Sequence, residues 1–389
     1  MAITGTNGKS TVVDLTSCIL KEAGFKAATC SSVSFRIGDK DEPNTLRMTM
    51  PEGFYVQKFL RKAVDAQCDY VVLEVTSEGI KQHRHEFIDF ELAAITNLTP
   101  EHIESHGNFE NYKKAKGKLF KKIKKIHILN LDDQYFDYFS QFPAEKKYEY
   151  GLLGSKPQPL GSAEISNRYF QKILGKDVSV LNESIQFSVN NTKIQLKLLG
   201  EFNVYNALAA ICIGLSQGIS LATSKNGLEK ARGIPGRMEI VISDPFRVIV
   251  DYAFTPNALT QVYKSIRSNF KPQKMICVLG SCGGGRDKWK RPILGEIAAK
   301  YCDKIVVTNE DPYDENPMEI IDQIAEGTRG KAIKILDRRK AINHALNLIG
   351  PGDLAVITGK GSEPSICLAG GKQIPWDDRK VVREEFQKL

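Results

Sequence analysis

A glycine-rich turn near the start of the chain, TGTNGKST (residues 4–11), constrains the fold more than any other feature. It follows the apolar segment MAIT and precedes a helix-length segment from Ser10 to Ala23. Glycines let the backbone amides of such a turn point at phosphate oxygens, and the start of a helix adds partial positive charge. Lys9 can reach terminal phosphates and Ser10 can ligate magnesium. The turn predicts a nucleotide site between a strand and a helix, although the spacing of its glycines is shorter than in the usual GxxxxGK[ST] loop.

Strand-like and helix-like segments alternate along the first part of the chain. Short apolar runs such as YVVLEV (70–75) and IHILNL (126–131) are separated by helix-length segments such as 52–66. This alternation predicts a mostly parallel sheet covered by helices. Between residues 148 and 199 polar and apolar positions alternate around an Asn-Asn turn, which predicts a small antiparallel sheet beside the parallel one.

The sequence GIPGRM (233–238) is the most linker-like stretch in the middle of the chain. Beyond it the alternation resumes, with strand-like runs such as MICVLGS and LAVITGKG. We therefore predict an α/β fold, with a P-loop ATPase domain over residues 1–232 and a Rossmann-like α/β domain over residues 233–389.

Composition limits the class of protein. An apolar content of 42% and a charged content of 26% are typical of a globular chain. The formal net charge of +8 is spread along the sequence, and its densest run, residues 112–125, also has helical apolar spacing. We interpret this run as the solvated face of a basic helix rather than as a polyanion site, and we expect no nucleic-acid partner.

Cysteine usage and hydropathy indicate the compartment. The eight cysteines form no CxxC pair and most lie in apolar runs, which indicates buried thiols rather than disulfides or a zinc site. The sequence contains no apolar run long enough to span a bilayer and no signal-peptide pattern at its start. We expect a cytoplasmic monomer that does not insert into membranes.

Polar residues follow the strands predicted in the first domain. Glu74 ends YVVLEV, and His102 comes shortly after the next strand-like run. The carboxyl ends of parallel strands form the usual active-site edge, and phosphoryl transfer needs charge neutralisation by a metal. Either residue could hold that metal, but a single histidine is more often a surface or packed residue than a ligand.

The motifs taken together resemble those of the Mur ligase family. In the first domain they are TGTNGKST, LEVTSEG, TNLTPEHIESHGNFENYKKAKGKLF and GEFNVYNALAA; in the second they are GIPGRME, DYAFTPNAL, GGGRDKWKRPILGEIA, TNEDPYDENP and GKGSEP. Their order and spacing are most similar to the MurE branch, which adds the third amino acid of the peptidoglycan stem peptide. The resemblance implies a central ATP-binding domain over residues 1–232 and a C-terminal amino-acid-binding domain over residues 233–389.

The resemblance implies an ATP and Mg²⁺ site in the first domain. Lys116 matches a lysine that the family carbamylates with carbon dioxide, so that a cation becomes an anion beside the metal. The implied catalytic residues are Lys9, Glu74, His102 and Lys116, and the implied metal ligands are Ser10, Glu74, His102 and Lys116. The implied nucleotide-binding residues are Gly5, Thr6, Asn7, Gly8, Lys9, Ser10, Thr11, Asn203, Asn206, Arg237 and Asp251.

The resemblance also implies an amino-acid site in the second domain. Arg286 would hold the carboxylate of the incoming amino acid, because a planar guanidinium can contact both oxygens. Glu363 would face its ammonium group. The implied substrate-binding residues are Arg286, Asp311, Tyr313, Gly359 and Glu363.

The chain departs from the family pattern at several positions. Phe254, Glu78 and Ser362 stand where the family has histidines. Ligases of meso-diaminopimelate resemble DNPR where this chain has Asp311 for the asparagine and Tyr313 for the arginine. That arginine holds the distal carboxylate of diaminopimelate, so its replacement weakens the expectation that diaminopimelate is the amino acid added. Lysine, ornithine or another amino acid stays open as the substrate.

The implied reaction is ATP-dependent amide formation, which adds a free amino acid to a UDP-muramoyl dipeptide through an acyl phosphate. Two alternatives stay open: a folylpolyglutamate synthase-like ligase, and a non-catalytic ATP-binding subunit of the same fold. The motifs DYAFTP, GGGRDKWKRP and GKGSEP disfavour the folate branch. Because the chain begins just before the glycine-rich turn, we expect the UDP-binding domain of MurE-type ligases to be missing, either by truncation or by nature.

Overall fold

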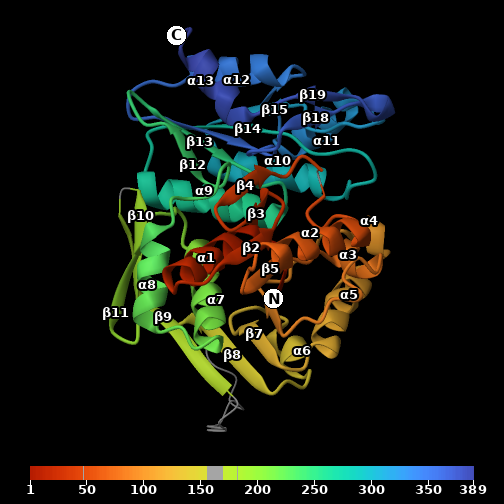
Figure 1. The fold of residues 1–389 in the computed structure, drawn as a ribbon. Helices are drawn as coiled ribbons and strands as arrows, with labels where there is room; N and C mark the ends of the chain where they lie inside the picture. Colours follow the sequence, from red (N-terminus) through yellow and green to blue (C-terminus); the bar gives the residue numbers. More distant parts are fainter. Residues whose placement is uncertain (47, 156–169, 182) are drawn as a thin grey trace. The chain divides into compact units, whose positions relative to one another are not determined.

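The computed structural model describes residues 1–46, 48–155, 170–181 and 183–389 (Figure 1). By the contacts between its residues the chain divides into two compact units. The first comprises Met1–Pro100 and Asn108–Arg232, and the second comprises Glu101–Gly107 and Gly233–Leu389.

The first unit is built on an eleven-stranded sheet with the strand order β11-β10-β9-β8-β7-β6-β1-β5-β2-β3-β4. Pairing is parallel from β2 through β5, β1, β6, β7 and β8 to β9, and antiparallel at both ends. The prediction of a mostly parallel sheet is confirmed. The strands are β1 Ala2–Thr4, β2 Ala27–Cys30, β3 Ser34–Ile37, β4 Lys40–Pro43, β5 Tyr70–Glu74, β6 Leu92–Ile95, β7 Ile126–Asn130, β8 Lys146–Leu152, β9 Phe170–Leu181, β10 Ser184–Val189 and β11 Thr192–Leu196.

The alternating region of the sequence forms the antiparallel end of this same sheet. β9, β10 and β11 pair antiparallel, and the turn between β10 and β11 has positive φ at Asn190 and Asn191, as the Asn-Asn signal predicts. β9 also pairs parallel with β8, which joins these strands to the main sheet. Alternation fixes which side chains face the core but not which strand is the neighbour, so the sequence could not show this. Part of the region, residues 156–169, lies outside the described residues.

Helices cover the sheet of the first unit. α1 and α7 bury apolar side chains in a shared core, and α7 is apolar on nearly every side, since most of its residues are buried. α8 packs on both of them. The helices are α1 Lys9–Glu22, α2 Gly53–Asp65, α3 Ser77–Lys81, α5 Phe109–Lys122, α6 Phe136–Ser140, α7 Phe202–Ser216 and α8 Leu221–Lys230.

The second unit has a six-stranded sheet with the order β12-β13-β17-β14-β15-β16, parallel except for the edge strand β12. Its strands are β12 Glu239–Ile242, β13 Arg247–Asp251, β14 Met275–Leu279, β15 Lys304–Thr308, β16 Ala332–Ile335 and β17 Leu354–Thr358, with a separate hairpin of β18 Ser365–Cys367 and β19 Gln373–Pro375. Its helices are α4 Ile103–His106, α9 Pro256–Phe270, α10 Lys290–Tyr301, α11 Pro317–Gly327, α12 Arg338–Asn347, α13 Asp378–Phe386 and the 3₁₀ turn Ala369–Gly371. The predicted α/β fold is confirmed. Within the described ranges, no helix has the length and apolar character needed to cross a bilayer.

A buried ion pair attaches the last helix to the second unit. Arg338, at the start of α12, donates from Nε and Nη2 to the two carboxylate oxygens of Asp378 at 2.8 and 2.6 Å. Both side chains are almost fully buried. The indole of Trp376 also donates to Asp378, at 2.8 Å. The C-terminal helix is therefore a packing element of the unit.

Replacing Asp378 with alanine should destabilise the second unit. The change would leave a buried guanidinium without its carboxylate, which typically costs about 3–5 kcal/mol. Urea unfolding followed by circular dichroism would measure the loss. Asp322→Ala, which removes one end of the half-exposed pair with Lys334, serves as the control and should change the midpoint little. Equal effects of the two variants would contradict this account of the ion pair.

Candidate functional site

The glycine-rich turn connects β1 to α1, as predicted, and it fits tightly against the residue that follows β6. Gly5 has a φ of +140°, and a Cβ built on it would lie 1.9 Å from Thr96 Oγ1. Gly8 has a φ of +84° and caps α1. Both positions therefore require glycine, and the turn cannot relax away from the sheet.

Two polar residues after β6 hold the turn in place. Thr96 Oγ1 donates to the carbonyl of Asn7 at 2.6 Å, and Asn97 Nδ2 donates to the same carbonyl at 3.1 Å. Asn97 Oδ1 accepts from the backbone amide of Asn7 at 3.0 Å. The sequence analysis did not single out either residue. The available signal was their position directly after a buried strand.

Glu74 lies at the end of β5, beside Ser10 and Lys9. Its carboxylate accepts from Ser10 Oγ at 2.9 Å and from the backbone amide of Ser32 at 3.0 Å, and Lys9 Nζ lies 3.7 Å from it. Ser32 Oγ also hydrogen-bonds Ser10 Oγ, at 2.8 Å. The structure thus brings together three of the predicted residues and adds Ser32, which no sequence signal had indicated.

Lys116 is buried in the same place. Its Nζ donates to the carbonyl of Gly5 at 2.9 Å and to Thr4 Oγ1 at 3.3 Å, and lies 4.9 Å from the centre of the Tyr112 ring. Burial and then the charge of Lys9 lower its pKa well below the ordinary value, although Glu74 acts in the opposite direction. A lowered pKa favours the neutral amine, which is the nucleophilic form of lysine. We call Lys9, Ser10, Glu74 and Lys116 the loop cluster.

The loop cluster has a donor set that suits a hard cation. A hydroxyl and a carboxylate are oxygen ligands of the kind that Mg²⁺ prefers. Over the described part of the chain, no group of three His, Cys, Asp or Glu side chains could hold a metal ion. A cation here would therefore take Ser10 and Glu74 as ligands and draw on other oxygen atoms, of which a carbamate on Lys116 would be one.

Asn203 and Asn206, on the first turns of α7, lie beside the glycine-rich turn. A Cβ on Gly8 would lie 2.3 Å from Asn206 Oδ1. Asn206 Nδ2 donates to Asn203 Oδ1 at 2.8 Å, and Asn203 Nδ2 donates to the carbonyl of Leu199 at 2.7 Å. Both asparagines are buried, which is unusual for this residue type unless it is hydrogen-bonded.

In the second unit, the predicted residues follow the carboxyl ends of parallel strands. Asp251 ends β13 and accepts from the backbone amides of Ala253 at 2.6 Å and Met238 at 2.7 Å; burial raises its pKa. The guanidinium of Arg237 lies over the ring of Tyr252, 4.0 Å from its centre. Asp251 thus fixes the segment that carries Arg237.

A fully buried lysine links the predicted acidic residues. Lys360 Nζ donates to Asp311 at 2.8 Å and also to Glu363, whose other oxygen accepts from the hydroxyl of Tyr252 at 2.9 Å. The sequence analysis missed Lys360, although it lies within GKGSEP beside the predicted Gly359. We call Tyr252, Asp311, Lys360 and Glu363 the edge cluster.

Tyr313, Arg286 and Gly359 lie around the edge cluster. Tyr313 has a φ of +50°, and a Cβ on Gly284 would lie 2.6 Å from its ring, so the two loops are in close contact. Arg286 is exposed. A Cβ on Gly359 would lie 2.4 Å from the carboxylate of the buried Glu310.

His102 is the N-cap residue of α4. It lies in the segment Glu101–Gly107, which groups with the second unit. Within that unit, Glu101 accepts from the buried Lys290 Nζ at 2.7 Å, and the backbone amide of Glu104 donates to Asp287 at 2.9 Å. These contacts fix the backbone on both sides of His102, whose part in a metal site stays a prediction.

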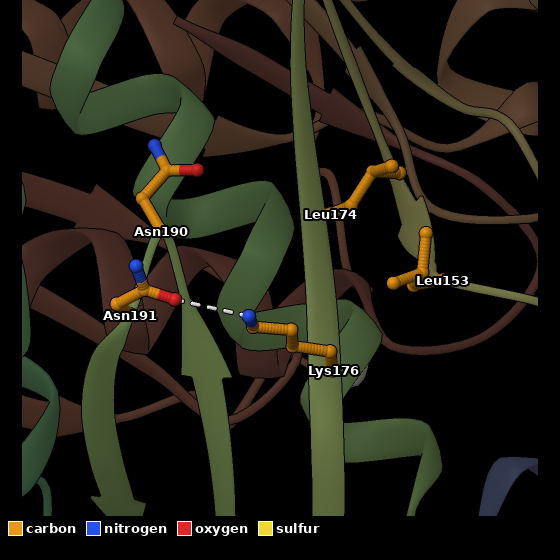
Figure 2. Close-up of a pocket in the computed structure, with 5 residues that line it drawn as sticks. All are labelled: Leu153, Leu174, Lys176, Asn190 and Asn191. Atoms are coloured by element: carbon orange, nitrogen blue, oxygen red, sulfur yellow. Dashed lines mark hydrogen bonds between the residues drawn. The ribbon is translucent and has the colours of Figure 1, made fainter.

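An open pocket lies elsewhere in the first unit (Figure 2). Lys176 and Asn191 line it and form a hydrogen bond of 3.0 Å, and Leu153, Leu174 and Asn190 complete its wall. None of the predicted site residues is among these five residues, so the pocket adds nothing to the candidate site.

Comparison with known proteins identifies the family. The Mur ligase middle domain matches residues 3–214, and the glutamate ligase domain of Mur ligases matches residues 236–361. The chain belongs to the Mur ligase family. The resemblance predicted from the motifs is thereby confirmed.

Individual proteins similar to this chain include ligases and solved structures. A UDP-N-acetylmuramoyl-L-alanyl-D-glutamate--2,6-diaminopimelate ligase of Syntrophomonas wolfei is 38% identical over 99% of this chain and 77% of its own length. The solved structure of another ligase of that name is 27% identical, with a TM-score of 0.62 over 100% of this chain and 78% of its own. The solved structure of Mycobacterium tuberculosis folylpolyglutamate synthase shares the fold alone. It is 18% identical, with a TM-score of 0.69 over 92% of this chain and 88% of its own.

Replacing Lys116 with methionine should stabilise the protein at neutral pH, because a buried amine would give way to an apolar chain of similar length. We expect a gain of about 1–2 kcal/mol. The folded wild type binds fewer protons at Lys116 than the unfolded chain does, so its stability should rise with pH between the lowered pKa and 10.5. Urea midpoints at neutral and alkaline pH would measure both effects. A variant that is less stable than the wild type, or that keeps the full pH slope, would contradict this prediction.

Proposed function

We propose that the protein is an ATP-dependent acid–amino-acid ligase that adds a free amino acid to a UDP-N-acetylmuramoyl dipeptide during peptidoglycan precursor synthesis. The observation that carries the proposal is the loop cluster: a buried lysine lies directly beneath a phosphate-binding turn, beside a serine and a glutamate, in a chain of the Mur ligase family. We assign nucleotide binding to residues 1–232 and amino-acid binding to residues 233–389.

The reaction has two steps. The terminal carboxylate of the dipeptide attacks the γ-phosphorus of ATP, which forms an acyl phosphate and releases ADP. The amino group of the incoming amino acid then attacks the acyl carbon, forms the amide bond, and releases inorganic phosphate and a proton. Negative charge develops on the transferred phosphoryl oxygens, so positioned cations and amides accelerate the first step.

The residues of the first unit have distinct roles in this proposal. The backbone amides of the turn and Lys9 would hold the phosphates, and Asn203 and Asn206 would lie on the adenine side. Ser10 and Glu74 would hold Mg²⁺, with a carbamate on Lys116 and with His102 as further ligands. Mg²⁺ supplies positive charge against the phosphate oxygens.

The residues of the second unit would bind the amino acid and complete the nucleotide site. Arg286 has a guanidinium available for a carboxylate, and Glu363 would face the ammonium group. Arg237 would contribute positive charge to the phosphates, and Asp251 keeps its segment in place. We propose a monomer that acts in the cytoplasm.

The identity of the amino acid is an open part of the proposal. The Syntrophomonas relative carries diaminopimelate in its name. In this chain Tyr313 offers a phenol at the position of the arginine expected in such enzymes, and Asp311 is already paired with Lys360. A neutral phenol cannot form an ion pair with a distal carboxylate, so lysine and ornithine belong beside diaminopimelate as candidates.

The proposal predicts phosphate release that depends on both acceptor and amino acid. The purified chain would be incubated with ATP, Mg²⁺, UDP-muramoyl-alanyl-glutamate and single amino acids, with mass spectrometry of the product. We expect a tripeptide product with at least one of diaminopimelate, lysine or ornithine. Product with a folate and glutamate would favour the folylpolyglutamate synthase-like alternative. ATP binding without turnover on any acceptor would favour the non-catalytic one.

Replacing Lys116 with alanine should reduce turnover by about 10²-fold or more, because the metal would lose an anionic ligand. Short carboxylates such as acetate or formate should restore part of the activity by occupying the space of the carbamate. The matched control is Lys114→Ala on the exposed face of the same helix, which should retain activity and show no carboxylate effect. Full activity of the Lys116 variant would refute the carbamate role and leave the ligase assignment intact.

A further inference from the structure

Helix α5 exposes a row of lysines on the side opposite to Lys116. Lys114, Lys118, Lys121 and Lys122 are all exposed, and their spacing places them on one face. The charge of Lys122 acts on Glu86, whose pKa is lowered first by the hydrogen bond from His83 and also by Lys122. Lys116, the residue that α5 contributes to the loop cluster, lies on the buried face of this helix.

Two phenylalanines near this face are almost completely exposed. Phe54, on the first turn of α2, exposes 85% of its surface, and Phe87, in the turn after α3, exposes 93%. Phe87 also has a φ of +59°, a backbone conformation that is rare for a bulky residue. Both rings are therefore available to a partner outside the folded chain.

The phenylalanines and the lysines belong to one surface. Gln57, one turn after Phe54, donates from Nε2 to the carbonyl of Glu86 at 3.4 Å, so the start of α2 lies beside the turn that carries Phe87. α3 packs on α5, and both helices lie at the same edge of the unit (Figure 1). The pKa of His85 is lowered by burial and, next, by the charge of Lys122, which places Lys122 near this turn.

A surface of this kind matches an anionic bilayer. Lysines on a helix face attract acidic head groups, and exposed aromatic rings enter the boundary between head groups and acyl chains. A single-stranded nucleic acid fits less well, because its sites place aromatic rings along the same groove as the basic groups that follow the backbone. Here the rings belong to α2 and to the turn after α3, while the lysines belong to α5.

We propose that the surface formed by Phe54, Phe87 and the exposed lysines of α5 docks the protein reversibly on anionic phospholipid membranes. This contact goes beyond the ligase function and does not depend on it. The sequence analysis interpreted the basic run as a solvated face; the exposed rings are the observation that changes this interpretation.

Sedimentation with lipid vesicles tests the proposal. The purified full chain would be mixed with vesicles of phosphatidylcholine alone, and with vesicles in which about a third of the lipid is phosphatidylglycerol. We expect binding to the second kind only, and loss of binding in high salt. Equal binding to both kinds, or no binding to either, would overturn the proposal.

Variants locate the contact. Lys118→Gln with Lys121→Gln should weaken binding by about 25-fold, at roughly fivefold per lysine. Phe54→Ser with Phe87→Ser should weaken it to a similar degree. The matched controls are Lys193→Gln with Lys197→Gln, which removes the same charge near the β11 edge, and Leu153→Ser, which removes another exposed apolar side chain. If the control pair weakens binding as much as the α5 pair, binding reflects total charge and the proposed surface is wrong.

Phe87→Gly separates docking from folding. Glycine accepts a positive φ, so this variant should unfold at the same temperature as the wild type or higher, while vesicle binding falls. Ligase activity without vesicles should stay unchanged in all these variants. If the α5 and phenylalanine variants instead lose binding to a single-stranded RNA and keep vesicle binding, the surface serves a nucleic acid and the membrane proposal fails.

Discussion

A lysine amine buried beneath the glycine-rich turn is the constraint on which the site depends. Lys116 reaches from α5 to the end of β1 and donates to Gly5 and Thr4, so it fixes the helix, the strand and the turn relative to one another. A methionine or leucine would fill the same space without an amine to desolvate. Burial lowers the pKa of the retained lysine and so favours the neutral, nucleophilic form of its amine, which a structural role alone does not require.

In both units, the predicted site residues gather at the edge where the parallel strands end. In a parallel sheet, successive strands all end at one edge, so residues distant in sequence meet there without long loops. In the first unit this edge gathers Ser10, Glu74 and Thr96 around the turn. In the second it gathers Asp311 and Glu363 on one buried lysine, Lys360, and the hydroxyl of Tyr252 donates to Glu363. Both edges therefore combine a buried amine with carboxylates, and in both a glycine allows the backbone to come close.

Local signals in the sequence predicted local structure well, and contacts between distant segments poorly. The turn TGTNGKST correctly predicted the strand before it and α1 after it, because glycine turns and helix starts depend on residues that are close in sequence. The parallel pairing of β8 with β9 could not be predicted, since alternation does not name a partner strand. Lys360 and Asn97 were not predicted for the same reason, because their partners are distant in sequence. Asp311 is 49 residues from Lys360, and the turn that Asn97 holds is 90 residues before it. The roles predicted for His102 and Arg286 come from the family resemblance alone, because no local pattern indicates them, and they stay predictions.

Helix α5 has one buried face and one exposed face. Lys116 points inward to the turn, while Lys118 and Lys121 point to solvent, and the helix between them is held by buried Tyr112 and Phe120. A ligand on the outer face can change the inner one only if it binds two conformations of the helix with different affinity. The structure shows α5 in one conformation, packed through its buried residues. Docking at this surface would therefore change where the protein acts and leave the chemistry of the loop cluster as it is.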